Sequence, residues 1–138
     1  MNYFADLTDT VAKALTEDVG DGDVSSFLVS EDKQARAGVI SRQTAIVCGR
    51  PWVDEVMRQV DPNIEINWLV DDGDLVQRDD ILYQLNGAAR SLLTAERTAL
   101  NFLQTLSGTA TRTRHYVDLI QDTNAVLLDT RKTIPGLR

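Results

Sequence analysis

The longest regular pattern in the chain begins at Ser91 and continues to about Leu106. Apolar residues recur along it at helical spacing, at Leu92, Ala95, Ala99, Phe102, Leu103 and Leu106. This spacing predicts a long amphipathic helix with one apolar face. Ser107 and Gly108 are expected to interrupt the helix, and the composition favours a second helical stretch over residues 109–122.

Shorter helices and strands are predicted around this helix. One helix is expected over 7–19, with Gly20 as its stop, and another is opened by Gly49-Arg50-Pro51 and ended by Asp61. We expect strands over 35–42 and 44–48, lying side by side, and over 64–70 and 81–85, the last ending in a turn at Asn86-Gly87. The apolar run from Ala125 into Thr130 is typical of a strand buried on both faces, as in an α/β barrel.

Composition narrows the class of protein. With 43% hydrophobic and 25% charged residues, the chain of 138 residues can bury a core, and its apolar runs are too short to span a bilayer. The net charge of -7 argues against a nucleic-acid partner. The lack of a signal-like N-terminus and the single cysteine, Cys48, predict a soluble protein of a reducing cytoplasm.

Positive charge is concentrated towards the C-terminal end. Residues 97–138 carry six of the 14 basic residues and three of the 21 acidic ones. Thr130, Arg131 and Lys132 directly follow the predicted buried strand, where α/β folds place their ligand sites. An arginine fork suits carboxylates, and a lysine suits phosphate or carboxylate. The alternative is a solvated basic loop.

Arg97 is the second candidate for an anion site. It lies in the middle of the predicted long helix, among small and apolar residues. Its ordinary role would be a helical ion pair with a neighbouring acid. If the helix packs in an interface, Arg97 would instead be a partly buried cation that needs an anion.

Other candidate sites have weaker support. His115 has no acid, cysteine or second histidine at ligand spacing, which argues against a metal or triad role. Asp18, Asp21 and Asp23 lack the later residues of a calcium loop and are interpreted as a solvated turn.

Several segments resemble the quinolinate phosphoribosyltransferase family (nicotinate-nucleotide pyrophosphorylase, carboxylating). They are Leu15-Thr16-Glu17-Asp18-Val19-Gly20 with Asp23, Cys48-Gly49, Val70-Asp71-Asp72-Gly73-Asp74, Leu92 to Gly108, and Leu128 to Arg138. The resemblance implies an α+β fold: a hammerhead-like α/β sandwich over residues 1–107, then over 108–138 a linking helix and the first strand of a truncated α/β barrel.

The resemblance also implies a pentosyltransferase of de novo NAD biosynthesis. It would convert quinolinate and phosphoribosyl pyrophosphate, with Mg2+, into nicotinate mononucleotide, CO2 and pyrophosphate. Thr130, Arg131 and Lys132 would bind quinolinate, and Arg97 would serve the site of the neighbouring subunit in a homodimer. Arg138 matches the family motif without an assigned role, and no catalytic residue is assigned.

Family members are about twice as long as this chain. We therefore expect the Mg2+ ligands to lie outside these residues and the 138 residues alone to show no turnover. Two other functions stay open: a related phosphoribosyltransferase that uses nicotinate, and a dimerisation module without catalysis.

Overall fold

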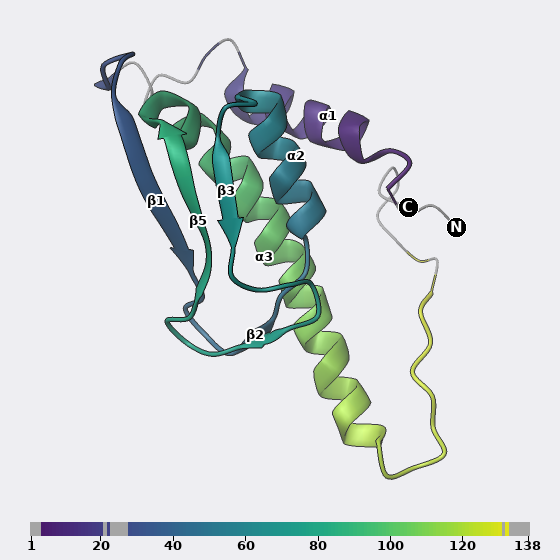
Figure 1. Ribbon diagram of the computed structural model, residues 1–138. Helices are drawn as coiled ribbons and strands as arrows, with labels where there is room; N and C mark the ends of the chain where they lie inside the picture. The colour runs from purple at the N-terminus through teal and green to yellow at the C-terminus, as the bar shows by residue number, and fades with distance from the viewer. Residues whose placement is uncertain (1–3, 21, 23–27, 131, 133–138) are drawn as a thin grey trace.

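The computed structural model describes residues 4–20, 22, 28–130 and 132. The helices are α1 (Leu7–Val19), α2 (Arg50–Val60) and α3 (Ala89–Ile120). The strands are β1 (Gln34–Ile40), β2 (Ala45–Ile46), β3 (Glu65–Trp68), β4 (Leu75–Val76) and β5 (Ile81–Ala88). These elements confirm the predicted α+β class, and Figure 1 shows how the helices lie against the strands.

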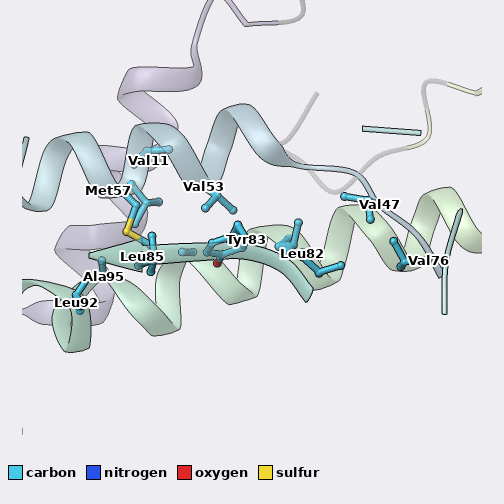
Figure 2. Close-up of a cluster of buried hydrophobic side chains, with 13 residues drawn as sticks. Val11, Val47, Val53, Met57, Val76, Leu82, Tyr83, Leu85, Leu92 and Ala95 are labelled. Atoms are coloured by element: carbon cyan, nitrogen blue, oxygen red, sulfur yellow. The ribbon is translucent and has the colours of Figure 1, made fainter. Parts of the chain in front are cut away.

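The larger sheet has the antiparallel order β1-β5-β3, and β2 pairs with β4 in a separate ladder. Glu65, Asn67, Gln84 and Asn86 on one face of the larger sheet are exposed. Tyr83 and Leu85 face the other way, into a core shared with the helices. Figure 2 shows these two side chains beside Val53 and Met57 of α2.

A bulge in β5 explains why two consecutive residues are buried. Val39 of β1 is opposite Tyr83, whereas Ile40 is opposite Ile81, so Leu82 has no partner in the register. An extra residue of this kind breaks the strict alternation of a strand. Leu82 is 7% exposed and Tyr83 is 1% exposed, and both belong to the core.

The predicted pairing of the first two strands is wrong. β1 pairs with β5 and β2 pairs with β4, so neither strand neighbours the other. Between them Ser41 holds the backbone of the 79–80 turn: its N–H donates to the Asp80 carbonyl at 2.9 Å. Asn86 and Gly87 also lie inside β5 and form no turn, since Asn86 is paired with both β1 and β3.

Helix α3 continues through the expected break at Ser107 and Gly108. The Ser107 hydroxyl accepts from the Cys48 N–H at 3.0 Å and lies 3.1 Å from the Cys48 carbonyl. One turn later the Thr111 hydroxyl accepts from the Ile46 N–H at 2.8 Å. The two hydroxyls thus accept from backbone N–H groups of β2 and of the segment just after it, as the carbonyls of a neighbouring strand would. This anchoring offsets the helix-propensity cost of Gly108, which is about 1 kcal/mol relative to alanine.

The strand expected over 125–130 is not formed. The structure assigns no strand there, and residues 121–130 are all exposed. Val126 and Leu128 are 76% and 75% exposed. A strand of a parallel sheet needs hydrogen-bonding neighbours on its edges and cover on both faces, and the described residues supply neither to this segment.

A carboxylate at the junction of α1 and α2 gives a pH-dependent contribution to stability. Arg58 donates to both oxygens of Glu55 at 2.7 Å, and Gln59 donates to Glu55 Oε1 at 2.7 Å and to the Thr8 carbonyl of α1 at 2.9 Å. The hydrogen bond from Arg58 lowers the pKa of Glu55 to about 2, against the opposing effect of burial.

A lowered folded-state pKa stabilises the fold at neutral pH. This contribution should be complete above the ordinary glutamate pKa of about 4.5 and should be lost as the pH falls through the folded-state value near 2. Between these two pH values the free energy of unfolding of the wild type should fall by at most about 1.4 kcal/mol per pH unit on account of Glu55. We expect Glu55→Gln to remove this pH dependence. Urea unfolding from pH 7 to pH 2 would measure this. Glu17→Gln, at an exposed position of α1, is the control and should leave the profile unchanged.

Candidate functional site

Arg97 lies on α3 facing the end of α1. Its side chain is 69% exposed, and Nη1 donates to Asp18 Oδ1 at 2.8 Å. The second carboxylate oxygen, Oδ2, accepts from the Thr98 hydroxyl at 3.0 Å. Two neighbouring residues of α3 therefore hold one carboxylate of α1.

The partner of Arg97 differs from the ordinary expectation of an acid on the same helix. Asp18 is 79 positions away in the chain. The interpretation of Asp18 as part of a solvated turn is also wrong, because its side chain is only 18% exposed. Asp21 and Asp23 lie outside the described residues. Local spacing cannot reveal such a pair, although Asp18 does lie in a segment that carries the family resemblance.

The remaining predicted site residues lie after α3. Thr130 and Lys132 are exposed, and the Lys132 N–H donates to the Thr130 hydroxyl at 3.4 Å, which is a long contact. Arg131 and Arg138 lie outside the described residues. Within the described part of the chain, no hydrogen bond or ion pair joins Arg97 to Thr130 or Lys132.

A cleft of about 690 Å³ opens elsewhere, between the β1–β2 connection and the later half of α3. Its walls include apolar side chains of both sheets, and its polar lining includes Arg42, Gln104, Arg112 and His115. No acidic residue lines it among the described residues, and neither Arg97 nor Thr130 belongs to it. Arg42 and Arg112 are not among the site residues predicted from the sequence, although Gln104, Gly108 and Arg112 recur every fourth residue on one helical face.

Neither a metal centre nor a membrane span is apparent in the described residues. They contain no group of three or more histidine, cysteine or acidic side chains placed to hold a metal ion. Among the helices formed by these residues, none combines the length and the apolar character needed to cross a bilayer.

Comparison with known families matches two consecutive domains. Residues 15–107 match the N-terminal domain of quinolinate phosphoribosyl transferase, and residues 109–138 match the C-terminal domain of the same family. The first match includes Asp18 and Arg97, and the second includes Thr130, Arg131 and Lys132.

Two curated relatives illustrate the similarity. The chain is 39% identical over 135 residues to the chloroplastic carboxylating nicotinate-nucleotide pyrophosphorylase of Oryza sativa subsp. japonica, covering 96% of this chain and 36% of the relative. It is 35% identical over 122 residues to a probable carboxylating nicotinate-nucleotide pyrophosphorylase of Bacillus subtilis, covering 88% of this chain and 42% of that protein. The chain thus spans less than half the length of either relative.

Solved structures agree in fold. The nicotinate-nucleotide pyrophosphorylase of Francisella tularensis superposes with a TM-score of 0.90 at 45% identity, over 94% of this chain and 46% of that one. The corresponding protein of Ehrlichia chaffeensis gives 0.87 at 32% identity, over 94% and 48%. Together with the family match over 15–107, these likenesses show that the chain belongs to the quinolinate phosphoribosyltransferase family.

Proposed function

We propose that this protein acts in transfer of a phosphoribosyl group to quinolinate, forming nicotinate mononucleotide, CO2 and pyrophosphate from quinolinate and phosphoribosyl pyrophosphate. The observation that carries the proposal is Arg97, an exposed guanidinium held in place inside the segment that matches the family. Relatives are named for the same chemistry, one of them as a decarboxylating quinolinate phosphoribosyltransferase of Nicotiana tabacum.

The chemistry of quinolinate fits the cations of the proposed site. Two adjacent carboxylates on a pyridine ring must be drawn out of water, and an arginine fork is the side chain best shaped to replace their hydration. Arg97 would hold one carboxylate, while Thr130, Arg131 and Lys132 would hold the other and the ring. Holding the ring in a fixed electrostatic environment also favours the loss of CO2, in which charge develops on the ring.

A homodimer with shared sites is part of the proposal. Between Arg97 and Ile120 the helix rises about 35 Å, and residues 121–130 can span about 33–36 Å only when fully extended. Thr130 would therefore approach Arg97 of its own chain only with an almost straight connection. A partner subunit that supplies its own Thr130, Arg131 and Lys132 removes this constraint.

The Mg2+ ion of the proposed reaction would be held by residues beyond those described, and the roles proposed for Arg97 and Lys132 do not depend on it. The compartment is proposed to be the cytoplasm on account of the single, half-buried Cys48. The relatives differ in this respect, since some plant proteins are named as chloroplastic or mitochondrial.

Calorimetric titration with quinolinate and with nicotinate tests the proposal. We expect quinolinate to bind more tightly, because its second carboxylate gains a charged contact, and we expect Arg97→Ala to weaken quinolinate binding about tenfold or more. Arg114→Ala, at another exposed position of α3, is the matched control. The 138-residue protein alone should show no turnover of either quinolinate or nicotinate.

The alternatives predict different results. Equal binding of the two acids would favour the nicotinate-type enzyme, and a dimer in sedimentation that binds neither acid would favour the dimerisation module. Mixing Arg97→Ala with Lys132→Ala should restore about a quarter of the wild-type quinolinate sites, since half of the dimers are mixed and each has one intact site. Recovery of none would contradict sites shared between subunits.

A further inference from the structure

Asp18 occupies a position that does not favour its own helix. It lies in the last turn of α1, where the carbonyl end of the helix dipole repels a negative charge, and α1 has no basic residue in that turn. Both of its oxygens are nonetheless used, by Arg97 Nη1 at 2.8 Å and by Thr98 Oγ1 at 3.0 Å. The contact with α3 is therefore what stabilises an acid at this place.

The contact leaves a defined part of Arg97 available. A guanidinium can bind a carboxylate through two donors on the Nε–Nη2 edge or on the Nη1–Nη2 edge. Asp18 engages Nη1, and no residue of the described part of the chain accepts from Nε or Nη2. The open edge belongs to a side chain that is 69% exposed, so a ligand from outside can reach it.

We infer that Asp18 is a positioning residue: it fixes the Arg97 guanidinium through Nη1 and so presents the Nε–Nη2 edge to a carboxylate of the substrate. This inference rests on the proposed function, in which that substrate is quinolinate. An exposed arginine loses much rotational freedom when it binds, and one already held at Nη1 loses less. Thr98, which is 2% exposed, holds the other oxygen and so keeps Asp18 in place.

The opposite role for Asp18 is that of an anion that competes with the substrate for Arg97. If Asp18 acted only as a competing anion, it would neutralise Arg97 and weaken substrate binding. Positioning and competition predict opposite changes when the charge of Asp18 is removed. Asp18→Asn therefore separates them.

The first measurement is nitrogen-15 NMR of the Arg97 Nε–H group in the 138-residue protein, without ligand. Rotation about the Nε–Cζ bond should be slow in the wild type and faster in Asp18→Asn. Asp9→Asn makes the same substitution at an exposed position of α1 and should leave the rotation unchanged. Asp18→Glu should restore part of the restriction. Thr98→Val tests the same arrangement with both charges retained and should loosen the group to an intermediate degree.

The second measurement is a quinolinate titration followed at the same NMR signal. We expect Asp18→Asn to raise the dissociation constant about fivefold to tenfold and Thr98→Val to raise it by a smaller factor. Equal rotation in the wild type and Asp18→Asn would overturn the inference, as would unchanged or tighter quinolinate binding by Asp18→Asn. A wild-type signal that does not respond to quinolinate would overturn the proposed role of Arg97 in binding quinolinate. It would also overturn the inference that Asp18 positions Arg97 for that role.

Discussion

Tyr83→Ala should destabilise the protein by about 3–5 kcal/mol, which is the range for removing a fully buried aromatic ring from a core. Tyr83 is 1% exposed, and the centroid of its ring lies 4.4 Å from the ring centroid of Trp68, its cross-strand partner in β3. The Tyr83 side chain extends from β5 into the core that the strand shares with the helices (Figure 2). A domain is stable by only about 5–15 kcal/mol, so the loss would be a large share of the total.

Urea unfolding followed by tryptophan fluorescence would measure this effect. Tyr83→Phe is the matched control, because it keeps the ring and removes only the hydroxyl, and it should cost less than about 1.5 kcal/mol. Burial raises the pKa of the Tyr83 phenol, so the wild-type side chain is uncharged near neutral pH and neither substitution removes a charge. A Tyr83→Ala loss no larger than that of Tyr83→Phe would mean that the ring does not fill the core as described.

Gly49→Val is expected to destabilise the protein by about 2–6 kcal/mol, from two independent sources. Gly49 precedes α2 with φ 120°, which side-chain-bearing residues rarely adopt, and such strain costs about 1–3 kcal/mol. A Cβ at this position would lie 3.1 Å from Leu106 Cδ1 and 3.4 Å from Leu103 Cα. Crowding against α3 adds about 1–3 kcal/mol. Denaturant unfolding would give the sum.

Gly73→Val separates these two sources. Gly73 has φ 99°, but a Cβ there would meet nothing within 4 Å, so only the backbone strain should appear. The cost at Gly49 should therefore exceed that at Gly73. Equal costs would show that α3 yields to the added side chain without loss of packing.

Local patterns predicted most helix boundaries. The helix over 7–19 was predicted with both of its ends, because its apolar spacing and Gly20 are local signals. Pro51 similarly marked the start of α2. Strand pairing was less accessible: alternation says which face of a strand is buried and leaves its neighbours open. The side-by-side arrangement of the first two strands was therefore wrong, and the bulge at Leu82 had no local signal beyond two adjacent apolar residues.

The same limit applies to the candidate site. Arg97 was identified as a possible anion ligand from its place on the helix and from the family resemblance, and that role stays a prediction. Its ion pair with Asp18 joins residues 79 positions apart, which no window of the sequence spans. Ser107 shows the reverse case, in which a residue expected to break a helix is held in it by Cys48, 59 positions away.

The unbroken length of α3 has a consequence for any part of the molecule that follows it. Because Arg97 and Ile120 belong to one helix, inserting a single residue after Gly108 would rotate everything beyond Ile120 by about 100° around the helix axis while moving it only about 1.5 Å. Inserting seven residues would rotate it by about 20° and move it about 10 Å. The number of residues in this half of the helix therefore sets the direction in which the rest of the chain leaves the helix. That direction does not change in proportion to the distance of the helix end from Arg97.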